Sequence, residues 1–400
     1  MNVLVFNCGS SSLKYRLIAM PEEREIASGE AQRVGPPTAQ PSRIVHRVDG
    51  REEVITVPMH DHAGAFDEVM KVLARDARMT PDAIAHRFVH GGALFSEPTV
   101  VDDAVYAALE SVAHLAPIHN PPAMALLSAC RARAPRLPEV CVFDTAFHAT
   151  IPDYARTYAL PARVREGLGI RKYGFHGTSH QYVAEEAAKF VRKPLADLNA
   201  VSCHLGSGGS SLCAIVRGKS VDNTMGFSPL QGLVMSTRSG DLDPAVTLRL
   251  LARARGDAAS VERLLNRKSG VLGLSGATAD IRDVLAHSAG ATPDRMDLTA
   301  EVYLWRMRKY LGAYLAVVGE CDAIVFTDTI GETVPAVRLS VCSGMEAFGV
   351  KIDPARNANV TRYPCDVAAD DSLVRVLVIL TNEELAIARR TYQALIARAA

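Results

Sequence analysis

The sequence predicts an α/β protein with two similar mixed-sheet domains, and three observations support this prediction. Segments typical of strands and helices alternate along nearly all of the 400 residues. Two hairpins rich in glycine and serine, at residues 7–17 and 200–216, recur in the two halves of the chain. A chain of this length is too long for one ordinary core and suits two domains.

The first half contains strands, a hairpin and amphipathic helices. Strands are predicted at residues 3–7 and 83–92, and the hairpin at 43–57 has Asp49-Gly50 at its tip, which suits a type I′ turn. A helix over 61–77 gathers Phe66, Val69, Met70, Leu73 and Ala77 on one face. Two further helices at 102–116 and 121–134 precede a strand at 139–146.

The second half repeats this alternation. A helix over 178–192 is predicted to begin at a Thr178/Ser179 cap, and paired strands follow at 200–205 and 210–216. Asp243-Pro244 predicts the start of another helix, with proline at its first position. The remaining elements are a helix near 298–318, strands at 322–328 and 373–380, and a final helix at 383–399 capped by Asn382.

Composition excludes several classes of partner. The chain has 44 Lys and Arg, 44 Asp and Glu, and no cationic run, so no nucleic-acid partner is expected. The N-terminal segment lacks the pattern of a signal peptide, and charges interrupt the most apolar stretch, so no membrane partner is expected. Eight scattered cysteines indicate reduced thiols. We therefore expect a cytoplasmic protein.

The two hairpins favour phosphate binding. In the first, Gly9 permits a sharp bend, Ser10 and Ser12 offer donors, and Lys14 and Asn7 add a cation and a carboxamide. Successive backbone N–H groups at such a bend form a concavity for phosphate oxygens. One hairpin of this composition is more often a plain turn, but two in equivalent positions favour function. Neither has the spacing of a P-loop.

Charged residues stand at strand ends and in glycine-rich loops. Arg87 lies in a strand that ends at a glycine pair, and Asp144 follows the C-terminal end of a buried strand. His176 stands among small residues, and Arg238 lies in a Gly/Ser loop before a helix. Each alone could be a surface charge or a cap. Their shared settings favour a functional set.

Two pairs of histidines are spaced four residues apart, which raises the possibility of zinc. The pairs are His86 with His90 and His176 with His180. A zinc site needs three or four ligands, and no further ligand motif accompanies either pair. Metal binding by these histidines is therefore not favoured.

The assembled motifs resemble those of the acetate kinase family, within the superfamily of actin, sugar kinases and heat-shock chaperones. They are "FNCGSSSLKY", "HRFVHGG", "LAPIHNPPA", "VFDTAFH", "RKYGFHGTSH", "CHLGSGGSS", "MGFSPLQGL", "STRSGDLDPA", "SGVLGLSG" and "TNEELAIAR". The resemblance implies a duplicated ribonuclease-H-like (actin-like ATPase) fold with an active-site cleft between two domains, and a homodimer. The expected domains are residues 1–148 plus 382–400, and residues 149–381.

The resemblance also implies the site residues. Asp144 matches the catalytic aspartate, His176 the histidine that supports the transition state, and Arg87 and Arg238 the pair that grips carboxylate and phosphoryl group. Asn7 and Glu383 match the metal site. The ATP- and phosphate-binding residues implied are Lys14, Ser10, Ser12, His204, Leu205, Gly206, Ser207, Gly208, Asp280, Ile281, Arg282, Asp328, Thr329, Ile330, Gly331 and Glu332. The apolar substrate pocket implied comprises Val89, Ile118, Phe175 and Pro229 beside Arg87.

The activity implied is reversible, Mg²⁺- or Mn²⁺-dependent in-line phosphoryl transfer from ATP to acetate, which gives acetyl phosphate and ADP. A propionate or butyrate kinase, a kinase with another phosphoryl donor and a catalytically faded binding protein remain alternatives. The chain departs from the family where "DTIGET" at 328–333 replaces a run like GGIGEN, and where Ser207 replaces asparagine.

Overall fold

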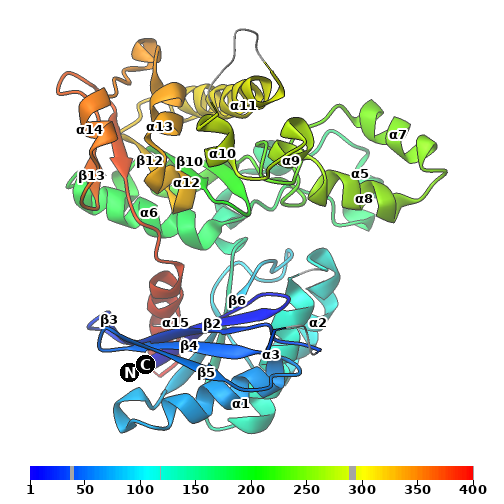
Figure 1. Cartoon of the computed structure of the whole chain (residues 1–400), viewed down its shortest axis with the longest axis vertical. Helices are drawn as coiled ribbons and strands as arrows, with labels where there is room; N and C mark the ends of the chain where they lie inside the picture. Colours follow the sequence, from blue (N-terminus) through cyan, green and yellow to red (C-terminus); the bar gives the residue numbers. More distant parts are fainter. Residues whose placement is uncertain (37–39, 118, 288–293, 400) are drawn as a thin grey trace. The chain divides into compact units, whose positions relative to one another are not determined.

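The computed structural model describes residues 1–36, 40–117, 119–287 and 294–399. The chain divides into two compact units (Figure 1). Unit 1 comprises Met1–Ala146 and Asn382–Ala400, and unit 2 comprises Phe147–Thr381. Each unit contains one mixed sheet with helices on both faces. The α/β fold expected from the sequence is confirmed.

Unit 1 contains an eight-stranded sheet in the order β5-β4-β3-β2-β1-β6-β8-β7. Strand β1 is antiparallel to β2 and parallel to β6, which is parallel to β8. The strands are β1 (Asn2–Cys8), β2 (Ser12–Ala19), β3 (Arg24–Gln32), β4 (Arg43–Val48), β5 (Arg51–Thr56), β6 (Ala83–Phe88), β7 (Thr99–Val100) and β8 (Glu139–Phe143).

Helices cover both faces of this sheet, which explains the unbroken apolar run of β1. Leu4 and Phe6 contact the core under α1 and α3, whereas Val3 and Val5 contact the cluster that includes α15. Successive residues of a strand point to opposite faces, so a strand buried on both sides needs apolar residues throughout. The helices of the unit are α1 (His62–Leu73), α2 (Asp103–Val112), α3 (Asn120–Arg133) and α15 (Glu383–Ala399).

Unit 2 contains a six-stranded sheet in the order β11-β10-β9-β12-β14-β13. Its strands are β9 (Ala200–Leu205), β10 (Ser210–Val216), β11 (Lys219–Asn223), β12 (Ala323–Thr327), β13 (Cys365–Asp366) and β14 (Arg375–Val378). Strand β9 is antiparallel to β10 and parallel to β12, which is parallel to β14. This order and these directions match β3-β2-β1-β6-β8-β7 of unit 1, with β13 and β7 both antiparallel at the edge. The sheet is therefore duplicated.

The helices of unit 2 also cover both faces of its sheet. Val183 and Ala187 of α6 pack with Val325 of β12 on one face, and Leu311 of α11 packs on the other face. The helices are α4 (Asp153–Arg156), α5 (Ala162–Gly167), α6 (Gly177–Phe190), α7 (Pro244–Arg253), α8 (Ala258–Arg267), α9 (Gly270–Ser275), α10 (Ile281–Leu285), α11 (Arg295–Val318), α12 (Asp328–Thr333), α13 (Pro335–Cys342) and α14 (Pro354–Ala358).

Several local predictions can be compared directly with the structure. Asp49 and Gly50 both have left-handed φ values, 49° and 73°, as the type I′ turn requires. Asp243 caps α7 as expected, by accepting a hydrogen bond from the Ala245 N–H. The predicted Thr178/Ser179 cap is wrong, because α6 begins at Gly177 and Ser179 is buried within its first turn. None of the described helices is both long enough and apolar enough to span a bilayer.

Candidate active site

A cluster of charged residues surrounds Arg87 in unit 1. Arg87, on β6, donates from Nη2 to Asp144 Oδ2 at 2.7 Å and from Nε to Asp144 Oδ1 at 3.1 Å. Its Nη1 donates to Asn7 Oδ1 at 3.3 Å and lies 3.3 Å from Glu383 Oε2. Asn7 lies on β1, Asp144 follows β8, and Glu383 begins α15. Four predicted site residues from four elements therefore meet in one place.

The cluster contains one cation and two carboxylates. Burial opposes the charge on Arg87, but Asp144 and Glu383 outweigh that effect and raise the pKa of Arg87 above its usual value. Asp144 is only 2% exposed, so Arg87 is the counterion that makes a buried carboxylate tolerable. Arg87 therefore stabilises the fold of unit 1 as the partner of Asp144.

The first glycine- and serine-rich hairpin borders this cluster. Asn7 on β1 is the cross-strand partner of Lys14 on β2, so their side chains lie on the same face of the sheet. The Gly9 N–H donates to the Ser12 carbonyl at 2.9 Å, which closes the bend. Ser10 and Lys14 are exposed. The hairpin therefore brings Lys14 into the neighbourhood of Asn7.

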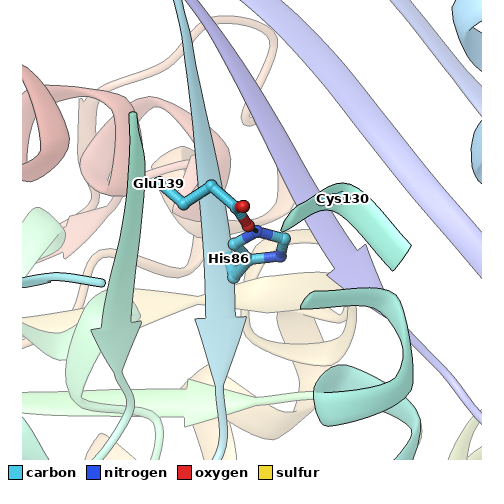
Figure 2. A group of neighbouring side chains, drawn as sticks. All are labelled: His86, Cys130 and Glu139. Carbon is cyan, nitrogen blue, oxygen red and sulfur yellow. Dashed lines mark hydrogen bonds and ion pairs between the residues drawn. The ribbon is translucent and has the colours of Figure 1, made fainter. Parts of the chain in front are cut away.

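A buried group lies on the opposite face of β6, because His86 precedes Arg87 in the strand. Figure 2 shows that the side chains of His86 and Glu139 point toward each other, with Cys130 nearby on α3. His86 Nε2 and a Glu139 carboxylate oxygen are 2.7 Å apart, a hydrogen-bond distance. Ligands around a tetrahedral zinc ion are more widely spaced, because each bond is about 2 Å long. We therefore interpret the group as a structural hydrogen bond.

The second glycine- and serine-rich hairpin contains the predicted phosphate turn of unit 2. The Gly206 N–H donates to the Gly209 carbonyl at 3.0 Å, between the end of β9 and the start of β10. His204, the second-last residue of β9, is nearly buried, and Leu205 lies in the core. Ser207 and Gly208 form the tip of the turn. This tip corresponds in topology to the bend at Gly9 in unit 1, as the duplication predicts.

His176 lies beside this turn. It adopts a left-handed conformation (φ 58°) immediately before α6, and its ring centroid lies 4.2 Å from that of His204. His176 Nδ1 and His180 Nε2 each hydrogen-bond Ser211 Oγ at 2.8 Å. Burial lowers the pKa of His180 well below its usual value. His176 and His180, which are spaced four residues apart, therefore both hydrogen-bond the hydroxyl group of Ser211.

Arg238 is the second predicted arginine, and its environment differs from that of Arg87. A Cβ atom added to Gly209 would lie 3.3 Å from Arg238 Nη1 and 3.4 Å from His176 Nε2, so both side chains border the turn. Burial lowers the pKa of Arg238. No carboxylate among residues 1–36, 40–117, 119–287 and 294–399 forms an ion pair with it. Arg238 Nη1 donates a hydrogen bond to the Pro229 carbonyl at 3.4 Å.

The remaining predicted residues occupy varied positions. Phe175 is buried and Pro229 half-buried in unit 2, Val89 is half-buried in unit 1, and Ile118 lies outside the described residues. Asp280 caps α10 and pairs with Arg282, whereas Ile281 is buried in the core of unit 2.

The segment 328–333 forms the short helix α12, with the Ile330 side chain in the core and the Glu332 carboxylate accepting backbone hydrogen bonds. Within 328–333, the side chain of Ile330 is therefore not available to a ligand, because it lies in the core.

Three hydroxyl residues, none of them among the predicted site residues, complete the environment of the histidines. Ser211 joins His176 to His180, and Ser179 hydrogen-bonds His204 Nδ1 at 2.8 Å and Thr381 Oγ1 at 2.9 Å. Ser179 and Ser211 stand inside the motifs quoted above, but serine is common in turns and caps. Only the fold shows that they link β9, β10 and α6.

The duplicated mixed sheet is consistent with the actin-like ATPase class of α/β proteins. Within that class the chain belongs to the acetokinase family, whose model matches residues 2–389. It is 47% identical to the acetate kinase of Alkaliphilus metalliredigens over 399 residues, which cover 98% of this chain and 99% of that one.

Two solved structures are also similar over almost their whole length. The acetate kinase of Porphyromonas gingivalis has a TM-score of 0.90 at 36% identity, over 98% of this chain and 99% of that one. A propionate kinase from Francisella tularensis has a TM-score of 0.89 at 34% identity, over 97% and 98% of the two chains.

Proposed function

We propose that this chain is an acetate kinase, which transfers the γ-phosphoryl group of ATP to acetate and releases acetyl phosphate and ADP. The observation that carries the proposal is Arg238, a half-buried cation at a glycine-rich turn with no carboxylate partner among the described residues. A half-buried cation without a carboxylate partner favours an anionic ligand. A planar guanidinium matches a carboxylate or a phosphoryl group.

The chemistry needs no general base. Acetate has a pKa near about 4, so it is ionised at neutral pH and can attack the γ-phosphorus directly. One acetate oxygen forms the new P–O bond while the bond to the ADP oxygen breaks, and charge accumulates on the phosphoryl oxygens. Arg87, Arg238 and His176 are the residues proposed to neutralise that charge. Asp144 holds Arg87 in position, as the 2.7 Å hydrogen bond indicates.

The oxygen atoms around Arg87 fit the predicted magnesium site. Asn7 Oδ1 and Glu383 Oε2 both approach the same nitrogen of Arg87, and the Asp144 carboxylate lies beside them. Amide and carboxylate oxygens are the ligands that Mg²⁺ and Mn²⁺ prefer. We propose that Asn7 and Glu383 hold this ion, with Asp144 oriented toward it or its water. When bound, the ion would screen the phosphate charges.

Lys14, Ser10 and Ser12 in unit 1 and the turn 204–208 in unit 2 are proposed to bind the phosphates of ATP. Asp280 and Arg282 on α10 are exposed or half-buried and are proposed to lie on the nucleotide side. We further propose that the chain works as a homodimer in the cytoplasm, without nucleic-acid or membrane partners.

A second candidate is a propionate kinase, and the similarity to the Francisella tularensis structure favours it. One methylene group changes binding by only about 1–3 kcal/mol, so two enzymes of nearly the same fold can differ in this preference. We favour acetate because Val89, which is proposed to line the pocket with Ile118, Phe175 and Pro229, is moderately bulky.

The proposal is tested by trapping acyl phosphate with hydroxylamine. Purified protein is incubated with Mg²⁺ and acetate, propionate or butyrate, with ATP, GTP or pyrophosphate as donor. Acetohydroxamate formation with ATP is expected to exceed product formation with the longer acids. Product with pyrophosphate alone would establish a different donor, and no product with any pair would contradict the kinase assignment.

A further inference from the structure

The start of α12 lies directly on the predicted phosphate turn. Asp328 Oδ2 is 3.1 Å from His204 Nε2, at the end of the strand that leads into the turn. A Cβ atom added to Gly206 would lie only 2.3 Å from the same oxygen. The carboxylate therefore rests against the backbone of Gly206, inside the space that a phosphate bound to this turn would approach.

The neighbouring Thr329 occupies a backbone donor of the turn. The Ser207 N–H, at the tip, donates to Thr329 Oγ1 at 3.1 Å. Backbone N–H groups at such a bend are the donors that a phosphate uses. Part of the donor set of the turn is thus already satisfied by α12.

A closed ring of hydrogen bonds holds Asp328 in this place. The Asp328 and Thr381 N–H groups donate to the same oxygen of Glu332, at 2.8 and 2.9 Å. Thr381 Oγ1 bonds Ser179 Oγ, which bonds His204 Nδ1, and His204 Nε2 contacts Asp328. Asp328 has a left-handed φ of 61°, which aspartate tolerates better than most residues. The position of the Asp328 carboxylate is therefore fixed by the backbone hydrogen bond to Glu332 and by the contact with His204.

We propose that Asp328 and Thr329 are specificity-determining residues that weaken nucleotide binding by competing with the donor phosphates for the turn. A bound polyphosphate must approach a fixed negative charge or displace it, and both raise the dissociation constant. Glycines at these positions, as in the run GGIGEN, have neither the carboxylate nor the hydroxyl. The inference rests on the proposed role of residues 204–208 as the phosphate turn.

The test measures ATP binding directly, by calorimetry with Mg²⁺ and without acetate, in D328N and D328G. D328N removes the charge and keeps the size, whereas D328G removes both. We expect the dissociation constant for ATP to fall at least about tenfold in D328N at low ionic strength, and the gain to shrink in high salt. T329G is expected to lower the dissociation constant for ATP by a smaller factor, because this substitution removes a neutral hydroxyl group and not a charge.

Asp371→Asn is the matched control, since Asp371 is an exposed aspartate of unit 2 that pairs with Lys351. Asp371→Asn removes one negative charge, as D328N does, but at a position far along the chain from the turn. It should leave the dissociation constant for ATP unchanged. Unchanged or weaker ATP binding in both D328N and D328G would overturn the inference. Because binding is measured without turnover, tighter binding in variants that make no acyl phosphate supports the inference while contradicting the proposed function.

Discussion

Arg87 and Asp144 form a two-point ion pair in unit 1, with Nη2–Oδ2 and Nε–Oδ1 separations of 2.7 and 3.1 Å. Asp144 is 2% exposed and Arg87 is 18% exposed. Arg238 in unit 2 has no such partner among the described carboxylates. The two arginines proposed for one reaction therefore differ in what their removal costs the fold.

Arg87→Ala is expected to reduce both turnover and stability. Loss of the cation removes the charged partner of the buried Asp144 carboxylate, which costs on the order of 3–5 kcal/mol. Turnover in the hydroxamate assay should fall by about a thousandfold or more, because charge neutralisation of the phosphoryl group is lost. Arg87→Ala/Asp144→Asn should regain stability in urea unfolding without regaining turnover. Recovery of turnover in the double variant would exclude the proposed role of Arg87.

Arg238→Ala is expected to reduce turnover without reducing stability. Turnover should fall by a similar order, since the same type of contact with the substrate is removed. The free energy of unfolding should stay equal or rise slightly, because no described carboxylate loses its partner and the charge that is removed is half-buried. Thermal unfolding and the hydroxamate assay provide the two measurements. A large loss of stability would show that Arg238 has a structural role instead.

Acid is expected to destabilise unit 1 through His90. Burial, with a smaller effect of His114, lowers the pKa of His90 to about 4, whereas the unfolded value is about 6.5. The folded state therefore keeps His90 neutral, and the unfolded state gains a proton as the pH falls below 6.5. The contribution of neutral His90 to the free energy of unfolding is fully present above pH 6.5 and is lost as the pH falls from 6.5 to 4. At pH 5 the free energy of unfolding should be lower by about 2 kcal/mol.

Calorimetric unfolding of His90→Asn checks this linkage. The Asn oxygen can replace Nδ1, which accepts a 2.9 Å hydrogen bond from the Gly92 N–H, but it does not titrate. The loss of melting temperature between pH 7 and 5 should be smaller in the variant. An identical loss in both proteins would assign the acid sensitivity to other groups, such as the buried His180.

Val89→Ala is expected to shift the acid preference. If Val89 lines the substrate pocket, removal of two methyl groups should raise kcat/KM for propionate relative to acetate by about tenfold. The measurement is kcat/KM for both acids in wild type and variant. Val246→Ala, an exposed valine on α7, is a suitable control. A ratio that stays constant would place Val89 outside the pocket.

The sequence predicted the architecture because the decisive signals are local. The apolar runs of β1 and β9, the type I′ turn at Asp49-Gly50 and the Asp243 cap all depend on neighbouring residues, and the structure contains each of them. The predicted Thr178/Ser179 cap failed because the left-handed His176 starts α6 earlier, and Ser179 is used in a tertiary hydrogen bond. Tertiary contacts overrode the local preference.

The site was less accessible to sequence reasoning. Motif position indicated Arg87, Asp144, Asn7 and Glu383, but nothing local shows that four elements bring them together. The approach of Asp328 to Gly206 depends on two segments separated by more than one hundred residues. Such contacts follow from sheet order, which places β12 beside β9.

Unit 1 is discontinuous along the chain, and this has a consequence for its biogenesis. Ile387 and Ala388 of α15 are fully buried against Val3, Val5 and Val140, which are synthesised long before them. During translation this face of the N-terminal sheet stays uncovered until unit 2 has been made, whereas unit 2 comes from one uninterrupted stretch. A ribosome that stalls after Thr381 would release a nascent chain with an exposed apolar sheet and without Glu383. The segment that follows unit 2 therefore completes both the earliest-made core and the proposed metal site, which makes chains truncated before it candidates for aggregation and chaperone capture.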